Sequence, residues 1–253
     1  MPRVSHDGRE TVFGQTDRGQ PSILCVHGSG GTRAVWKAQR ARLDATVTAL
    51  DLAGHGDSPS VEARPGPDLL ATYVEDVAAV ARAVDPDVLV GHSLGGAVTV
   101  TTLLDRSLEL DAAVVIGAGA TLPVSETLLE WLREDFERVI EFLHGPDRLF
   151  HTPDERLVER SDTLIRSVGQ AVTHADFQTC TAYDVSDRLA AIEVPVLGLV
   201  GAHDRLTPPS LLEPLVDGVD DAALVAVPAA AHLAMVERPR PVNAAISEFV
   251  GSR

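Results

Sequence analysis

One serine stands among glycines in the segment Gly91-His92-Ser93-Leu94-Gly95, which separates two apolar stretches. The pattern G-x-S-x-G often joins a buried strand to a helix through a sharp turn that lifts the serine above the edge of a sheet. A serine hydroxyl attacks a carbonyl only when a nearby base takes its proton. The segment therefore predicts a nucleophile at Ser93, and the alternative is a turn of small residues that only permits close helix packing.

The elements around this serine alternate between apolar runs and amphipathic segments. Continuous apolar runs are typical of strands in a parallel sheet that is covered on both faces. We predict strands at residues 22–27, 46–51, 87–92, 111–118, 194–200 and 223–228. Helices are expected at 33–43, about 68–84, after Ser93 and from about Pro239, and a hairpin turn at Asp7-Gly8 opens the chain. The order predicts an α/β fold with a mostly parallel central sheet and helices on both faces.

The alternation stops between the strands 111–118 and 194–200. Residues 122–190 instead carry apolar side chains at three- and four-residue spacing, which indicates helices. We expect a small helical cap there, inserted into a core made of residues 1–121 and 191–253. The candidates for an apolar substrate pocket are Trp131, Phe136, Leu143, Phe150 and Phe177. The alternative is that this stripe forms the cap's own packing.

Composition limits the partners of the chain. Its 253 residues are 45% hydrophobic, which suits one α/β domain with an insertion. The net charge is −16 and Lys37 is the only lysine, so nucleic acid and anionic membranes are poor candidates. We expect a small-molecule substrate and a monomer or homodimer. The acidic, lysine-poor surface resembles that of proteins from salt-accumulating microbes, although a GC-rich genome gives a similar composition.

Cysteine and histidine spacing indicates a mechanism without metal or cofactor. Cys25 and Cys180 are far apart in the chain, and Cys25 lies in an apolar run, so we expect two reduced thiols. The nine histidines include no familiar close ligand spacing, and no metal site is predicted. No apolar stretch approaches the ~18 residues of a membrane span, and the first residues lack the pattern of a secretory signal. The expected location is the cytoplasm.

Four more segments accompany the serine motif between the predicted strands: VHGSGG (26–31), LDLAGHGDS (50–58), VGAHDRLTPP (200–209) and AAHLAMVERP (230–239). With them the chain resembles the α/β-hydrolase superfamily over nearly its whole length. The segments DFQTCTAYDV (176–185) and GAGATLPV (117–124) are similar to those of its capped microbial esterases. The resemblance implies an α/β-hydrolase fold and a nucleophile, an acid and a histidine in that order.

The resemblance assigns the acid and the histidine to Asp204 and His232. An imidazole titrates near neutrality, so His232 can take the proton of Ser93 and later give it to the leaving group. Asp204 would hold the imidazole tautomer and stabilise the imidazolium. The alternatives are that Asp204 caps the following helix and that His232 is an ordinary surface histidine.

A tetrahedral oxyanion needs two fixed donors, and the backbone N–H groups of Leu94 and Ser29 are the candidates. Leu94 follows the nucleophile, and Ser29 lies in the glycine-rich loop after the first buried strand. Other histidines are expected to have structural roles. His92 should project to the far side of the turn from Ser93 and pack, whereas His27 and His55 should tie loop backbone together.

These residues favour a serine hydrolase, a carboxylesterase that cleaves a small, largely apolar carboxylic ester through an acyl-enzyme. A serine at position 93 argues against haloalkane dehalogenases and epoxide hydrolases, which use a carboxylate there. A thioesterase, a lactonase or a C–C bond hydrolase could use the same triad, because the fold does not fix the substrate. The remaining alternatives are a cofactor-free lyase or perhydrolase and a non-catalytic receptor for a small ligand.

Overall fold

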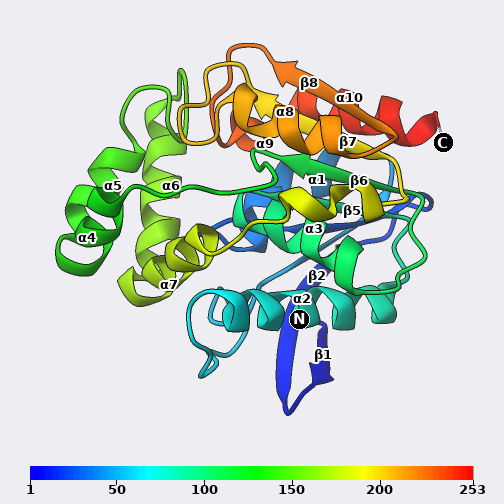
Figure 1. The fold of residues 1–253 in the computed structure, drawn as a ribbon, viewed down its shortest axis with the longest axis horizontal. Coiled ribbons are helices and arrows are strands. Elements are labelled where there is room, and N and C mark those ends of the chain that lie inside the picture. Colours follow the sequence, from blue (N-terminus) through cyan, green and yellow to red (C-terminus); the bar gives the residue numbers. More distant parts are fainter. Residues whose placement is uncertain (253) are drawn as a thin grey trace.

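The computed structural model describes residues 1–252, and an eight-stranded sheet runs through it (Figure 1). The strands lie in the order β1-β2-β4-β3-β5-β6-β7-β8. The predicted hairpin is β1 (Arg3–His6) and β2 (Arg9–Thr16), and β2 pairs antiparallel with β4. All other pairs are parallel, which confirms the predicted sheet. These strands are β3 (Ser22–Val26), β4 (Thr46–Leu50), β5 (Val88–His92), β6 (Ala112–Ile116), β7 (Val196–Gly201) and β8 (Ala222–Val227).

Helices cover both faces of the sheet, as the unbroken apolar strands predict. Successive strand residues point to opposite faces, so Leu24 lies in one buried cluster and Ile23 and Cys25 lie in the other. The first face is covered by α2 (Pro67–Val84), α3 (Leu94–Asp105) and α8 (Pro209–Gly218). The second is covered by α1 (Lys37–Arg42), α9 (Ala234–Glu237) and α10 (Pro239–Gly251). No helix within residues 1–252 is both long enough and apolar enough to cross a membrane.

Several predicted elements differ from the structure by one or two residues at their ends, and two of them differ for a local reason. The helix expected at 33–43 is a 3₁₀ helix, η1 (Arg33–Trp36), followed by the short α1. Thr32 begins η1, because its side chain accepts a hydrogen bond from the backbone N–H of Ala34. The strand expected at 111–118 ends at Ile116, because Gly117 has φ +58° and turns the chain out of the sheet.

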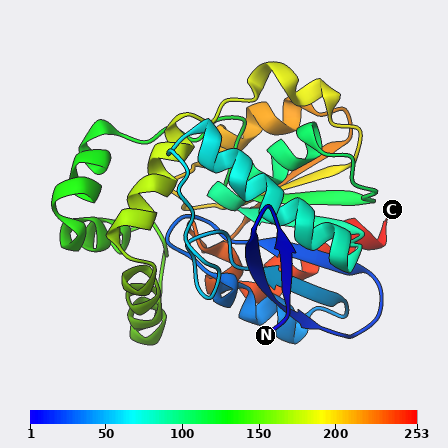
Figure 2. The same cartoon turned by 90° about the horizontal axis from the view of Figure 1, so that it is seen from below.

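Four helices form a cap at one end of the sheet (Figures 1 and 2). They are α4 (Glu126–Glu134), α5 (Phe136–Leu143), α6 (Glu155–Val168) and α7 (Gln170–Thr181), all within the segment 122–190. The side chains of Ser125, Asp135 and Asp154 each begin one of the first three helices by accepting a backbone N–H. A 3₁₀ helix, η2 (Ser186–Ala191), returns the chain to the sheet. Residue 253, the end of the predicted core segment 191–253, lies outside the described residues.

Candidate active site

Ser93 occupies a strained turn between β5 and α3. Its φ of 53° and ψ of −121° lie outside the regions that non-glycine residues favour, and such conformations cost about 1–3 kcal/mol. A Cβ at Gly91 would lie 2.2 Å from the carbonyl oxygen of Gly95, and one at Gly95 would lie 2.4 Å from that of Val26. Side chains at these two positions would collide with backbone across the turn, and glycine avoids this. The serine is therefore held at the edge of the sheet by a backbone that permits little else.

Asp204 and His232 meet beside this turn, although 27 residues lie between them in the sequence. Nδ1 of His232 donates to Oδ2 of Asp204 at 2.8 Å, and Asp204 is 3% exposed. The carboxylate also accepts the backbone N–H groups of Leu206 at 2.8 Å and Thr207 at 2.9 Å. The Thr207 hydroxyl is the fourth donor, at 2.8 Å. These four donors hold the carboxylate in place, and its bond to Nδ1 fixes the Nδ1–H tautomer of His232.

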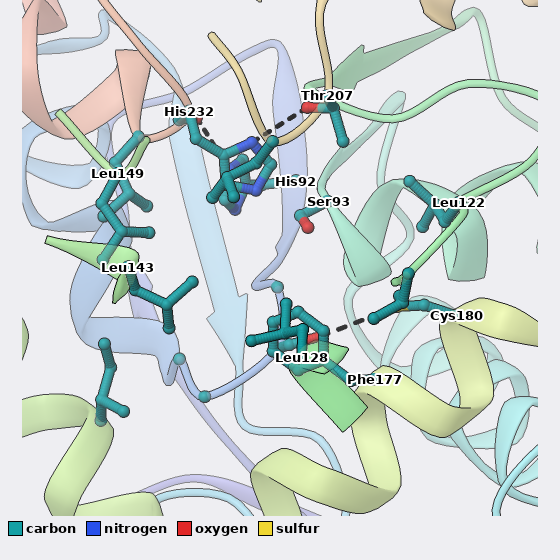
Figure 3. A pocket seen from close by; sticks show the side chains of 18 of the residues that line it. His92, Ser93, Leu122, Leu128, Leu143, Leu149, Phe177, Cys180, Thr207 and His232 are labelled. Carbon is teal, nitrogen blue, oxygen red and sulfur yellow. Dashed lines mark hydrogen bonds between the residues drawn. The ribbon is translucent and has the colours of Figure 1, made fainter. Parts of the chain in front are cut away.

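Thr207 is a site residue that sequence reasoning missed. Its hydroxyl oxygen lies 2.8 Å from Oδ2 of Asp204 and 3.0 Å from Nδ1 of His232, so it contacts both partners of the pair. Figure 3 shows the contact with His232. A signal was present in the segment Asp204-Arg205-Leu206-Thr207, since aspartate side chains often bond the backbone two and three residues on. That turn brings the threonine hydroxyl back to the carboxylate.

Ser93 and His232 line the same cavity, and Figure 3 shows the Ser93 side chain beside the histidine rings. Within residues 1–252 no hydrogen bond joins the Ser93 hydroxyl to the His232 ring. The other nitrogen of His232, Nε2, has no hydrogen-bond partner among these residues either. Catalytic hydrogen bonds are often long or poorly aligned in the unliganded state and form when substrate binds.

His92 lies beside His232, and not on the far side of the turn where the sequence placed it. The two ring centroids are 4.6 Å apart, and Nε2 of His92 donates to the backbone oxygen of His232 at 3.0 Å. Burial, followed by the neighbouring His232 ring, holds the pKa of His92 well below its usual value. His92 is therefore neutral at pH 7, and it fixes the backbone that carries His232.

The glycine-rich loop after β3 approaches the serine closely. A Cβ on Gly28 would lie 2.9 Å from Cβ of Ser93, so only glycine fits there. The backbone N–H of the next residue, Ser29, donates no hydrogen bond within residues 1–252, and the same holds for Leu94 at the start of α3. Free amides at a helix start and in a glycine loop are suited to an anion. Both predicted oxyanion donors are thus located beside Ser93.

His27 and His55 form hydrogen bonds with loop backbone, as the sequence predicts. Nδ1 of His27 donates to the oxygen of Gly28 at 2.9 Å, and its Nε2 accepts the N–H of Leu52 at 3.1 Å. Burial, followed by the neighbouring His55, lowers the pKa of His27 well below its usual value. His55 contacts the backbone oxygen of Ala53 at 3.0 Å and also reaches a cap carboxylate.

The cavity above Ser93 has a volume of about 250 Å³ and mostly apolar walls. Of the five predicted wall residues, Leu143 and Phe177 line it. Trp131, Phe136 and Phe150 are not on its wall. Phe150 is buried in the cap's own apolar cluster, and Trp131 and Phe136 pack against that cluster. Leu122, Leu128 and Leu149 line the cavity and were not among the predicted wall residues. Arg205 is the only Asp, Glu, Lys or Arg among the described residues that line it.

Two other sets of reactive side chains, a cluster of one aspartate with two histidines and the two cysteines, have structural explanations. Asp147, His151 and His203 bring ligand-type atoms within 4.8 Å of one another, but Asp147 is already bonded to His151 at 2.6 Å and lies 3.5 Å from Arg205. Cys25 and Cys180 are free and buried. Burial raises the pKa of both thiols, that of Cys180 to about 12, so neither is a thiolate nucleophile at pH 7.

Known proteins share this fold. The alpha/beta hydrolase family matches residues 23–245. A pimeloyl-[acyl-carrier protein] methyl ester esterase of Neisseria meningitidis serogroup B is 29% identical over 90% of this chain and 92% of its own length. A putative carbamate hydrolase, RutD, of Agrobacterium fabrum is 24% identical over 94% of this chain and 96% of its length. The solved structure of a thermophilic esterase superposes with a TM-score of 0.86 at 27% identity, covering 99% of this chain and 97% of that one. The chain belongs to the alpha/beta hydrolase family.

Proposed function

We propose that this chain is a serine esterase that cleaves small, largely apolar carboxylic esters, with Ser93 as nucleophile, His232 as base and Asp204 as the orienting acid. The observation that carries the proposal is the 2.8 Å hydrogen bond from His232 to Asp204 at the cavity that Ser93 also lines. A tautomer fixed at Nδ1 leaves Nε2 as the lone pair that can accept a proton. The esterase names among the relatives support the same class.

In acylation His232 acts first as a base and then as an acid. Nε2 of His232 takes the hydroxyl proton as Oγ of Ser93 bonds to the ester carbonyl carbon. The carbonyl electron pair moves to the oxygen, which accepts hydrogen bonds from the N–H groups of Ser29 and Leu94. Each such donor contributes about 3 kcal/mol to the transition state. The oxyanion then re-forms the carbonyl, the bond to the alcohol oxygen breaks, and the alcohol leaves with the proton from His232.

Deacylation repeats these steps with water. His232 takes a proton from water as the water oxygen attacks the acyl carbon, and the same two amides hold the second oxyanion. Collapse breaks the bond to Ser93, and the proton returns to Oγ. The products are a carboxylic acid and the free enzyme. Asp204 stays ionised throughout and stabilises the transient imidazolium.

The cavity favours an uncharged acyl group. Its walls are largely leucine, isoleucine, valine and phenylalanine side chains, which stabilise hydrocarbon and not charge. Among the described residues of the wall, Arg205 carries the only guanidinium; its side chain is 73% exposed and lies 3.5 Å from the Asp147 carboxylate. A phosphate-bearing arm or a terminal carboxylate would find no buried cation there. We therefore propose free, neutral esters of modest acyl length.

Burst kinetics test the nucleophile. A short-chain p-nitrophenyl ester should give a burst of p-nitrophenol with the unchanged chain, and Ser93→Ala should lose both the burst and the turnover. Ser167→Ala, which changes an exposed serine on α6, is the matched control and should behave as the unchanged chain does. A burst of equal size in Ser93→Ala would refute the assignment.

The alternatives share most of the machinery and differ in substrate. A thioesterase, a lactonase and a C–C bond hydrolase would be separated by a panel of esters, thioesters, lactones and vinylogous diketones. A cofactor-free lyase or perhydrolase would act on its own substrate and would not hydrolyse the compounds of this panel. A non-catalytic small-ligand receptor would leave Ser93 unlabelled by a fluorophosphonate, whereas the esterase proposal predicts stoichiometric labelling.

A further inference from the structure

Helix α7 of the cap presents a polar face to the core. Its buried residues are Thr173, Asp176, Thr179 and Cys180, and none of them has a large apolar side chain. Packing alone would favour leucine or phenylalanine at such positions, because a buried carboxylate has a large desolvation cost unless it is fully paired. Asp176 is 0% exposed. A buried carboxylate on this face of α7 therefore suggests a role that an apolar side chain cannot perform.

Three donors from three separate core segments converge on the Asp176 carboxylate. The backbone N–H of Gly30 donates to Oδ2 at 3.1 Å, and Nε2 of His55 lies 3.0 Å from the same oxygen. The Tyr73 hydroxyl donates to Oδ1 at 2.7 Å. The carboxylate thus joins the cap to the loop after β3, the loop after β4 and helix α2.

The Gly30 contact acts on the loop that carries a proposed oxyanion donor. Gly28 packs against Ser93, and Gly30 is held by Asp176, so the amide of Ser29 lies between two fixed points. Gly30 has φ +63°, and glycine also adopts many other backbone conformations. Gly30 therefore does not by itself fix the path of the loop. The loop also has an internal hydrogen bond, from the Gly31 N–H to the Gly28 oxygen at 3.1 Å. The bond from the Gly30 N–H to Asp176 is the one that connects this loop, and with it the Ser29 N–H, to the cap carboxylate.

A positive charge on His55 strengthens its hydrogen bond to the Asp176 carboxylate. Nδ1 of His55 faces the oxygen of Ala53 and Nε2 faces Asp176, so both nitrogens meet acceptors and the ring binds as an imidazolium. Charge-assisted hydrogen bonds are shorter and stronger than neutral ones. The other titratable groups against this ring are Tyr73, at 6.0 Å between ring centroids, and the neutral His27, at 4.7 Å.

We propose that Asp176 is a positioning residue that couples the docking of cap helix α7 to the geometry of the oxyanion loop. The proposal rests on the proposed esterase function, because it assigns the Ser29 N–H to the oxyanion. When the cap is docked, Asp176 holds Gly30 and the Ser29 amide faces the cavity. When this bond is lost, the loop keeps its contact with Ser93 but loses the fixed direction of its donor.

The variants Asp176→Asn and Asp176→Ala test the proposal against Thr179→Val. Thr179 lies one turn further along α7, and its hydroxyl accepts the backbone N–H of Gly66 at 3.0 Å, so it joins the cap to a core segment other than the oxyanion loop. Asp176→Asn should lower kcat about tenfold with KM within about twofold, since an oxyanion donor acts mainly in the transition state. Thr179→Val should lower the Tm and leave kcat near that of the unchanged chain.

Hydrogen–deuterium exchange gives a second measurement that needs no turnover. Asp176→Ala should speed exchange in the peptide that covers residues 28–31, whereas Thr179→Val should not. Equal exchange at 28–31 in the two variants, or an equal loss of kcat, would overturn the proposal. Failure of Ser93 to react with a fluorophosphonate in the unchanged chain would instead refute the esterase function, and the exchange result would still decide whether Asp176 holds the loop.

Discussion

At the scale of single residues, the pair of Asp204 and His232 is held by hydrogen bonds that are in place before substrate arrives. Asp204 accepts four hydrogen bonds, and two of its donors, His232 and the Thr207 hydroxyl, also lie within 3.0 Å of each other. Preorganised polar groups reduce the reorganisation needed when charge develops on the imidazole. Thr207 is thus a positioning residue of the proposed triad.

Replacing Thr207 with valine should separate this role from packing. Thr207→Val keeps the shape but removes a donor to a charged group, which typically contributes about 1.5–3 kcal/mol, and we expect kcat/KM to fall at least tenfold. Steady-state kinetics on a p-nitrophenyl ester measure the effect. Thr207→Ser retains the hydroxyl and should recover most of the activity. Equal activity in the valine and serine variants would mean that the hydroxyl does not assist the pair.

At the scale of secondary-structure elements, the central strands could be predicted from sequence because long apolar runs have few other uses in a chain of this size. The turn at Ser93 was predictable for a local reason, since the pattern G-x-S-x-G places glycine at the two positions, 91 and 95, where any side chain would collide across the turn. The wall of the cavity was not. Trp131 and Phe150 have the same apolar spacing as Leu143, and only the tertiary arrangement of the cap helices decides which side chain faces the cavity.

Long-range polar contacts were also beyond sequence reasoning. His55 and Asp176 are separated by 120 residues in the chain, and a single sequence holds no signal that pairs them. The same limit applies to His92, whose ring position is set by the loop that carries His232. Sequence patterns thus located residues near strand ends, where local chain direction determines position, and the resemblance paired Asp204 with His232. Contacts that neither source assigns, such as His55 with Asp176, were missed.

The pair of His55 and Asp176 makes an element-scale prediction about pH. Burial lowers the pKa of His55, but the Asp176 charge and the hydrogen bonds outweigh it, so the pKa is raised above about 6.5. A raised histidine pKa stabilises the folded state fully below pH 6.5, and this contribution is lost as the pH rises through the folded pKa. The difference in unfolding free energy between the unchanged chain and His55→Gln should therefore shrink as the pH rises.

Urea unfolding between pH 6 and 9 measures this difference. Tyr73→Phe removes another hydrogen bond to the same carboxylate, at 2.7 Å, without removing a group that titrates in this range, because burial raises the pKa of Tyr73 well above 10. Its destabilisation should stay constant over the same range. A His55→Gln difference that grew with pH would contradict the ion pair.

At the scale of the whole molecule, net charge determines behaviour more than any single pair. The 37 acidic residues exceed the 21 Lys and Arg residues by 16, so the folded surface repels itself at low ionic strength. The acidic residues are distributed along the chain. Screening shortens the range of this repulsion from about 10 Å at 0.1 M salt to about 3 Å at 1 M.

The Tm should consequently rise with KCl, steeply so if the surface is adapted to high salt. Thermal unfolding in 0.05–3 M KCl measures the dependence, with tetramethylammonium chloride at equal ionic strength as the control. Screening alone predicts the same rise in both salts, with most of it below about 0.5 M. A Tm that continues to rise only in KCl would indicate bound, hydrated cations. A Tm that does not change in either salt would refute the hypothesis of salt adaptation.

The central claim is that Ser93 becomes covalently acylated, and the most direct measurement is the site of the acyl adduct. The chain is mixed with a short-chain p-nitrophenyl ester, quenched in acid within the burst phase and digested for peptide mass spectrometry. The adduct should lie on the peptide that contains Ser93 and should be absent from Ser93→Ala. An adduct on another residue, or full turnover in Ser93→Ala with no adduct at position 93, would contradict the account.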